Sequence, residues 1–167
     1  MRYAGIIKND IAAAPGLSVT FFLQGCPHRC KGCHNPETWD YKGGKEFTPS
    51  VIDDIVRALT ANNIQRNLCI MGGEPLCPEN IFLTTLVIKE VKEKLPCVNI
   101  YIWTGYTYED LTKLYTNDKK FNFIINNSDF LIDGPYIEEL RDTTLKMRGS
   151  SNQRIINLIE LRNCDTI

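Results

Sequence analysis

Three cysteines lie within eight residues of this chain, Cys26, Cys30 and Cys33, with three residues in the first gap and two in the second. Soft thiolates at this spacing can converge on one metal centre. A cubane iron-sulfur cluster has four irons, so three cysteines leave one iron open to a small molecule. An open iron indicates catalysis and not only electron storage.

The alternative for the same segment is a structural zinc site. Cys26, Cys30 and Cys33, together with either His28 or His34, would give zinc a tetrahedral set of nitrogen and sulfur ligands. The protein would then be a non-catalytic binding module. Each histidine is also expected to serve simply in packing or hydrogen bonding, so the other loops must decide between the two metals.

The remaining cysteines are dispersed through the chain as Cys69, Cys77, Cys97 and Cys164. An odd total of seven, with three crowded together, does not resemble the even set of a disulfide framework. Reduced thiols and a metal site fit the pattern better. Burial in apolar packing is the expected state of the four isolated cysteines.

The composition sets the class of protein. With 167 residues, 43% of them hydrophobic, the chain can bury one ordinary core, so we expect a single domain over residues 1–167. The net charge is −1 and the 19 basic residues are scattered, which argues against nucleic acid as a partner. Residues 1–10 lack the features of a secretion signal, and no apolar run approaches membrane-spanning length. We therefore expect a cytoplasmic protein without membrane contact.

Strands and helices alternate along the chain. Apolar runs predict strands at residues 2–8, 18–23, 67–71, 98–103 and 130–132, and helical spacing predicts helices at 48–63, 78–95 and 108–115. Residues 119–127 fit either a helix or a strand, and residues 154–159 fit a last strand. This alternation predicts an α/β fold with a largely parallel sheet, whose chemistry lies in the loops after the strands.

One such loop is Gly72-Gly73-Glu74-Pro75, directly after the strand that ends at Met71. Two glycines let the backbone come close to a ligand, and the Glu74 carboxylate can accept from an ammonium group. Alone, the same four residues would be read as a turn.

In this order, the cysteine spacing and the glycine motif resemble the radical S-adenosylmethionine superfamily. Further stretches narrow the resemblance: Gln24-Gly25-Cys26, Cys33-His34-Asn35-Pro36 with Thr38-Trp39, Trp103-Thr104-Gly105-Tyr106, Asp133-Gly134-Pro135-Tyr136, and Arg148-Gly149-Ser150-Ser151-Asn152-Gln153-Arg154. Together they look like the activating enzymes of anaerobic, class III ribonucleotide reductases. The resemblance covers residues 15–153.

The resemblance implies a partial, open (β/α) barrel and two cofactors. A 4Fe-4S cluster would be held by Cys26, Cys30 and Cys33. S-adenosylmethionine would be flanked by Gly32, Cys33, His34, Gly72, Gly73 and Glu74. The superfamily usually has an aromatic residue just before the third cysteine, where this chain has Gly32, and the activating enzymes are similar in having glycine there.

The resemblance also implies the reaction. A one-electron donor such as flavodoxin or ferredoxin would reduce the cluster, the cofactor would be cleaved to methionine and a 5′-deoxyadenosyl radical, and this radical would take hydrogen from a glycine of the partner anaerobic ribonucleotide reductase. No separate acid-base residue is needed. Basic residues near the end of the chain are candidates for the docking rim or for a solvated face: Arg141, Lys146, Arg148 and Arg154.

Two other functions remain open at this point. One is another small enzyme of the superfamily, either an activase for a different glycyl-radical enzyme or a synthase of a deazapurine. The other is the zinc-binding module described above, which metal analysis after anaerobic purification would distinguish from the enzymes.

Overall fold

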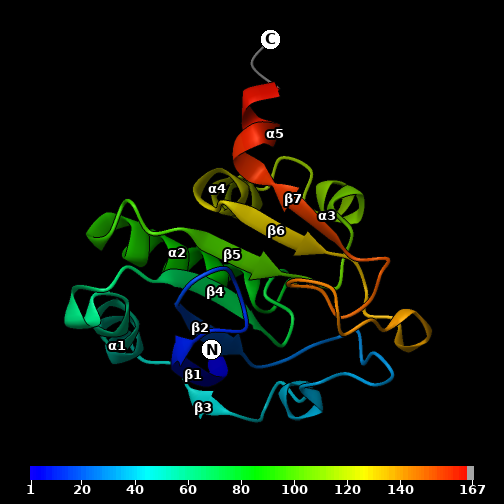
Figure 1. Ribbon diagram of the computed structural model, residues 1–167, viewed down its shortest axis with the longest axis horizontal. Coiled ribbons are helices and arrows are strands. Elements are labelled where there is room, and N and C mark those ends of the chain that lie inside the picture. Colours follow the sequence, from blue (N-terminus) through cyan, green and yellow to red (C-terminus); the bar gives the residue numbers. More distant parts are fainter. Residues whose placement is uncertain (165–167) are drawn as a thin grey trace.

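The computed structural model describes residues 1–164, which form one seven-stranded sheet with the order β3-β1-β2-β4-β5-β6-β7 (Figure 1). Strands β2, β4, β5 and β6 are parallel, whereas β1, β3 and β7 pair antiparallel with their neighbours. The strands are β1 (Arg2–Asp10), β2 (Ser18–Leu23), β3 (Lys45–Glu46), β4 (Asn67–Gly72), β5 (Ile100–Trp103), β6 (Phe130–Asp133) and β7 (Arg154–Asn157). Since β3 and β7 lie at opposite edges, the sheet is open. The predicted α/β fold with a largely parallel, open sheet is confirmed, and it is compatible with a partial barrel.

Helices cover one face of the sheet and bury the main core against it. These helices are α1 (Pro49–Leu59), α2 (Ile81–Lys94), α3 (Tyr108–Leu114), α4 (Lys119–Asn127) and α5 (Leu158–Cys164). Three short 3-10 turns lie in the connecting segments: η1 (Pro36–Thr38), η2 (Ala61–Asn63) and η3 (Glu138–Leu140). Phe21, Ile70 and Ile102 of the central strands are fully buried in this core together with Ile55 of α1 and Ile88 of α2. Burial of these apolar side chains is the main stabilising contribution.

The opposite face of the sheet has a smaller apolar cluster. Cys69, Tyr101 and Ile132 are buried there, and the Tyr101 ring stacks on Phe130 with 4.8 Å between ring centroids. Loop residues, among them Ala14, complete this cluster. The position of Cys69 agrees with the packing role expected of isolated cysteines.

Side-chain caps determine the secondary structure of the two segments whose sequence pattern was ambiguous, residues 119–127 and 154–159. Residues 119–127 form a helix because the Asp118 side chain accepts hydrogen bonds from the first backbone N–H groups of α4. The predicted strand at 154–159 is wrong beyond Asn157, whose side-chain oxygen accepts from the N–H groups of Ile159 and Glu160 as α5 begins. The sequence pattern also missed the two-residue strand β3.

The other dispersed cysteines differ in exposure. Cys77 is buried, with its thiol donating to the carbonyl oxygen of Glu74 at 3.2 Å, whereas Cys97 is exposed. The Cys164 side chain lies outside the described residues. Within residues 1–164, none of the helices has both the length and the apolar character needed to cross a bilayer.

Candidate functional site

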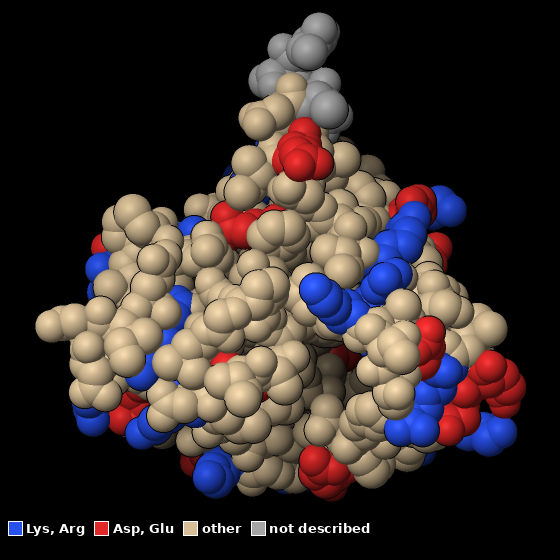
Figure 2. Space-filling view, in the orientation of Figure 1, with Lys and Arg blue, Asp and Glu red and all other residues tan. Residues whose placement is uncertain are grey.

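The site lies where the parallel strands end. A cavity of about 260 Å³ opens there, and the surface is hollowed between the sheet and the loops beside it (Figure 2). Its lining comes from the loops after β2, β4, β5 and β6 and from the segment before β7, including Cys26, His28, Cys30, Cys33, His34, Gly72, Gly73, Glu74, Trp103, Thr104, Gly105, Gly134, Tyr136, Met147 and Gln153. Because parallel strands present their carboxyl ends at one edge, loops far apart in the sequence meet here.

The cysteine loop leaves β2 through a hydrogen-bonded frame. The Gln24 side chain is buried and donates to the carbonyl oxygens of Glu37 and Asp40 at 2.9 and 2.7 Å. Gly25 has a φ of 98°, and its N–H donates to the Thr38 carbonyl at 2.7 Å. These bonds fix where the loop starts and where it returns to the body of the protein.

Cys26, Cys30 and Cys33 are all partly exposed and all line the cavity. Burial raises the pKa of Cys26 to about 11, although a hydrogen bond from the His28 backbone lowers it in part. Burial also raises the pKa of Cys30. Without a metal, Cys26 and Cys30 are therefore neutral thiols at pH 7, and bound iron would supply the positive charge that keeps them ionised.

Among the described residues, no three His, Cys, Asp or Glu side chains already converge closely enough to hold a single ion. His28 is instead hydrogen-bonded to Glu74, and the His34 ring faces Tyr136 with 5.8 Å between ring centroids. Three thiols around one larger cavity fit a cluster with an open iron, because a cubane spans more space than one ion.

Gly73 lies directly against the start of the cysteine loop, and Gly72 lies against the end of β2. A Cβ on Gly73 would be 2.3 Å from the Gly25 carbonyl oxygen, and one on Gly72, whose φ is 101°, would be 2.9 Å from Phe22. The N–H of Glu74 donates to the same Gly25 carbonyl at 2.8 Å. Glycine is therefore required here for close backbone approach.

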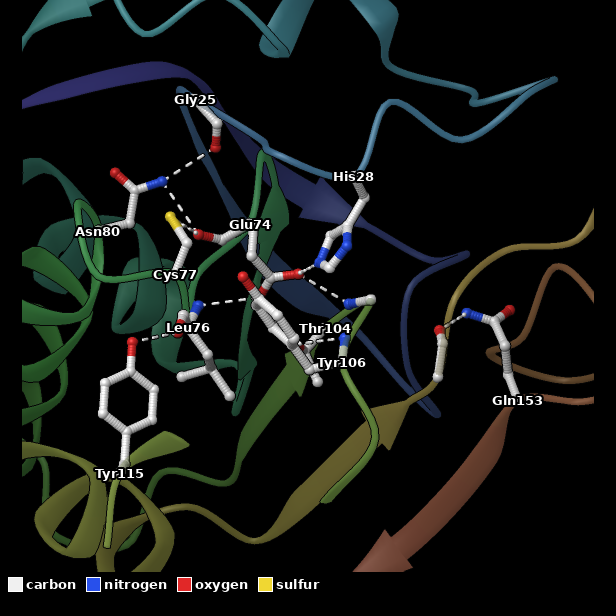
Figure 3. A network of polar contacts seen from close by, with 12 residues as sticks. Gly25, His28, Glu74, Leu76, Cys77, Asn80, Thr104, Tyr106, Tyr115 and Gln153 are labelled. Atoms are coloured by element: carbon white, nitrogen blue, oxygen red, sulfur yellow. Dashed lines mark hydrogen bonds and ion pairs between the residues drawn. The ribbon is translucent and has the colours of Figure 1, made fainter. Parts of the chain in front are cut away.

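The Glu74 carboxylate is the centre of a buried network (Figure 3). Its Oε1 accepts from the Leu76 N–H at 2.9 Å and the Thr104 hydroxyl at 2.7 Å, and its Oε2 accepts from the Gly105 N–H at 2.7 Å and from His28 Nε2 at 2.9 Å. The carboxylate is thus already satisfied by the protein. Acceptance from a cofactor ammonium stays a prediction.

Gly32 and His34 flank Cys33 in the cysteine loop. Gly32 is not among the cavity-lining residues; it has a φ of 75°, and a Cβ there would be 1.9 Å from a Glu138 carboxylate oxygen. His34 and Cys33 both line the cavity. A cofactor-binding role for Gly32, Cys33 and His34 stays a prediction.

The Arg148–Arg154 stretch folds back on the loop after β6. Gln153 Oε1 accepts from the N–H groups of Gly149 and Ser150 at 2.8 and 3.2 Å, and its Nε2 donates to the Gly134 carbonyl at 3.1 Å. This side chain thereby closes one end of the cavity. Its sequence motif was recognised, but its role is visible only in the structure.

Two of the four candidate rim residues have structural partners. Arg154 binds the buried Asp133 and the exposed Glu109, and this hydrogen bonding lowers the pKa of Glu109 to about 2. Arg148 donates to the Gln153 carbonyl at 3.0 Å. Among residues 1–164 no ion pair holds Arg141 or Lys146.

Asn80 is a site residue that sequence reasoning missed. Its buried side-chain amide donates to the carbonyl oxygens of Gln24, Gly25 and Glu74 at 3.0 to 3.1 Å. Figure 3 shows the bond to Gly25. It therefore joins the cysteine loop to the glycine motif just before α2. A single asparagine before a helix is read as an ordinary capping residue, so the pattern carried no signal of this bridge.

Comparisons with known proteins agree with this geometry. The profile of the 4Fe-4S single cluster domain family matches residues 12–156. The chain is 35% identical over 156 residues to the anaerobic ribonucleoside-triphosphate reductase-activating protein of Vibrio cholerae, covering 93% of this chain and 97% of that one. Proteins of the same name from Escherichia coli K12 (32% identical; 95% and 99% covered) and phage T4 (35% identical; 93% and 93% covered) are similarly related. The chain therefore belongs to the family of anaerobic ribonucleoside-triphosphate reductase-activating proteins.

Proposed function

We propose that this chain is a radical S-adenosylmethionine enzyme that generates a glycyl radical on an anaerobic ribonucleotide reductase. Its 4Fe-4S cluster is held by Cys26, Cys30 and Cys33. The observation that carries the proposal is the meeting of these three cysteines with Gly72–Glu74 at one cavity. The names of the related proteins support the choice of partner.

When bound, the reduced cluster would supply one electron that cleaves S-adenosylmethionine to methionine and a 5′-deoxyadenosyl radical, which would take a hydrogen atom from a glycine Cα. The protein's part is to bind and orient. Cys26, Cys30 and Cys33 would each lose the thiol proton on binding iron, and three protein ligands for four irons would leave one iron free to bind the cofactor. Gly72 and Gly73 let the end of β4 pack closely on Phe22 and Gly25, which brings the glycine motif beside the cysteine loop.

The protein also restricts water around the reacting atoms. Met71, Trp103, Tyr136 and Met147 line the cavity, and Trp103 is fixed by a 2.7 Å hydrogen bond from its indole N–H to the Met147 carbonyl. A radical that attacks unactivated carbon needs its target held close and competing molecules excluded. These apolar walls support that requirement.

The finer parts of the proposal concern the electron donor and the docking rim. Flavodoxin or ferredoxin would deliver single electrons to the cluster, and the reaction would take place in the cytoplasm. Arg141 and Lys146 are the better candidates for partner docking, because Arg148 and Arg154 are engaged within the protein. Charged rim residues chiefly raise association rates and specificity.

The first experiment tests the radical chemistry. The protein is reconstituted anaerobically with iron and sulfide, reduced with dithionite and given S-adenosylmethionine, and 5′-deoxyadenosine and methionine are measured by chromatography. Both products are expected from the wild type. No product, with zinc bound in place of iron, would refute the proposal and favour the binding module.

A second experiment tests the partner. The reduced, cofactor-loaded protein is mixed with an anaerobic ribonucleotide reductase, and electron paramagnetic resonance is used to look for a glycyl radical. The same mixture with the reductase glycine changed to alanine is the control. Cofactor cleavage without a radical on the reductase, but with turnover of a pterin-like substrate, would favour a deazapurine synthase.

A further inference from the structure

Glu74 connects three separate loops of the site. The side chain is almost fully buried, and its four hydrogen-bond donors belong to the loop after β4, the loop after β5 and the cysteine loop. A carboxylate taken out of water is stable only when donors replace its hydration, so these loops must keep their relative positions to satisfy it.

His28 is the donor that the cysteine loop supplies. A carboxylate only accepts, so Nε2 of His28 carries the proton in the 2.9 Å bond to Glu74. The edge of its ring packs on Tyr106 with 4.5 Å between centroids, and a Cβ on Gly105 would be 2.6 Å from the imidazole Cδ2. The loop after β5 therefore leaves little room for any other position of this ring.

Besides a hydrogen bond from the Tyr136 backbone to the Cys30 sulfur, few described contacts secure the segment between Cys26 and Cys33. Lys31 pairs with Glu139 at 3.1 Å, but the two side chains are 81% and 68% exposed. An ion pair so open to water contributes little to holding a loop. The His28 side chain is only 19% exposed, and its backbone also hydrogen-bonds the Cys26 sulfur. His28 thus links a cluster ligand to the glycine motif.

We infer that His28 is a positioning residue, whose bond to Glu74 sets the distance between the cluster-bearing loop and the cofactor-binding end of β4. The inference deepens the proposed function and rests on it. The cluster and the cofactor are held by different segments, and electron transfer into the cofactor requires that these segments keep a fixed distance from each other. A misplacement of about 1 Å can reduce a reaction about 100-fold, so a single tie of this kind has a measurable effect.

Two substitutions separate the hydrogen bond from the ring. His28→Phe keeps a ring against Tyr106 but cannot donate, whereas His28→Gln places an amide N–H close to the position of Nε2. Lys31→Ala is the matched control, because it removes a contact of the same loop that is exposed to solvent. The measurements are iron and sulfide content, the spectrum of the reduced cluster with and without S-adenosylmethionine, and the rate of cofactor cleavage.

We expect His28→Phe to bind iron, because its three cysteines remain, but to cleave saturating S-adenosylmethionine about 100-fold more slowly. The cofactor-induced change in its cluster spectrum should be altered. His28→Gln should recover cleavage to within about tenfold of the wild type, since the bond to Glu74 is kept. Lys31→Ala should match the wild type in every measurement.

Hydrogen exchange in the metal-free protein tests the His28–Glu74 hydrogen bond in the absence of the cofactors. The backbone amides of residues 26–33 should exchange faster in His28→Phe than in His28→Gln or the wild type. If His28→Phe takes up no iron, His28→Asn, whose amide is too short to reach Glu74, replaces it in the spectroscopic comparison.

Equal behaviour of His28→Phe and the wild type in both exchange and spectrum would overturn the inference, as would equal impairment of the Gln and Phe variants. A wild type that fails to cleave the cofactor would instead count against the proposed function, and hydrogen exchange would still decide the role of His28.

Discussion

On the sheet side of the cavity, Gly73 and Glu74 follow a buried strand and are fixed by hydrogen bonds from several loops, whereas on the other side residues 26–33 contain no helix or strand. The sheet-side wall, Gly73 and Glu74, is therefore positioned by the sheet and its loops. The cysteine wall, residues 26–33, is anchored at its ends and through His28, and its three thiols are partly exposed. The difference indicates that the sheet-side wall is held by more of the protein's own hydrogen bonds than the cysteine wall.

The largest effect is expected from the cysteine wall. Cys30→Ala leaves two cluster ligands, so bound iron and cofactor cleavage should both fall to background. Iron analysis and chromatography of 5′-deoxyadenosine measure this. Cys97→Ala is the control, because Cys97 is exposed and does not line the cavity. Full activity of Cys30→Ala would mean that the three-cysteine assignment is wrong.

Gly73→Ala tests the contact between the two walls. The new Cβ would meet the Gly25 carbonyl at 2.3 Å and force the walls apart, so cofactor cleavage should fall about 100-fold. Gly5→Ala is the matched control, since nothing lies within 4 Å of its added Cβ. Initial rates of 5′-deoxyadenosine formation compare the two variants; equal rates would show that the walls do not need this close approach.

Glu74→Gln tests whether the protein's own hydrogen bonds hold the sheet-side wall. The glutamine NH₂ group would face donors that now bind a carboxylate oxygen, so the free energy of unfolding of the metal-free protein should fall by about 1–3 kcal/mol. Urea titration measures this change. Glu93→Gln, at an exposed helix position, should leave the value almost unchanged. An unaltered midpoint for Glu74→Gln would argue against a wall held by these bonds.

The smallest effect is expected at the β6–β7 end of the sheet side, where Glu109 binds Arg154. The pKa of Glu109 is lowered in the folded protein from 4.5 to about 2, so the pair stabilises the fold above the unfolded pKa and loses its effect as pH falls through about 2. Glu109→Gln should lower Tm slightly at pH 6, and the difference from the wild type should shrink between pH 4 and about 2. In an Arg154→Ala background the substitution should have no pH-dependent effect on Tm.

Most elements of the fold were predictable because their apolar period matches a helix or a strand. The central strands at Ser18–Leu23 and Asn67–Gly72 and the helix at Ile81–Lys94 lie close to their predicted places. Residues 119–127 remained ambiguous, since only the Asp118 cap distinguishes the helix from a strand. The error after Asn157 has the same origin, because a strand and a helix meet there without a glycine or proline.

The cysteine spacing, the glycine motif and the alternation of strands and helices that brings them to one edge of a sheet could all be recognised from the chain, because they depend on residue type and order. The use of Glu74 became visible only in the folded protein. Its partners His28 and Thr104 are 46 and 30 residues away, and no local pattern records which loops meet there. The bridge made by Asn80 was hidden for the same reason: a hydrogen bond between distant residues depends on the packing of the whole sheet, which local periodicity does not encode.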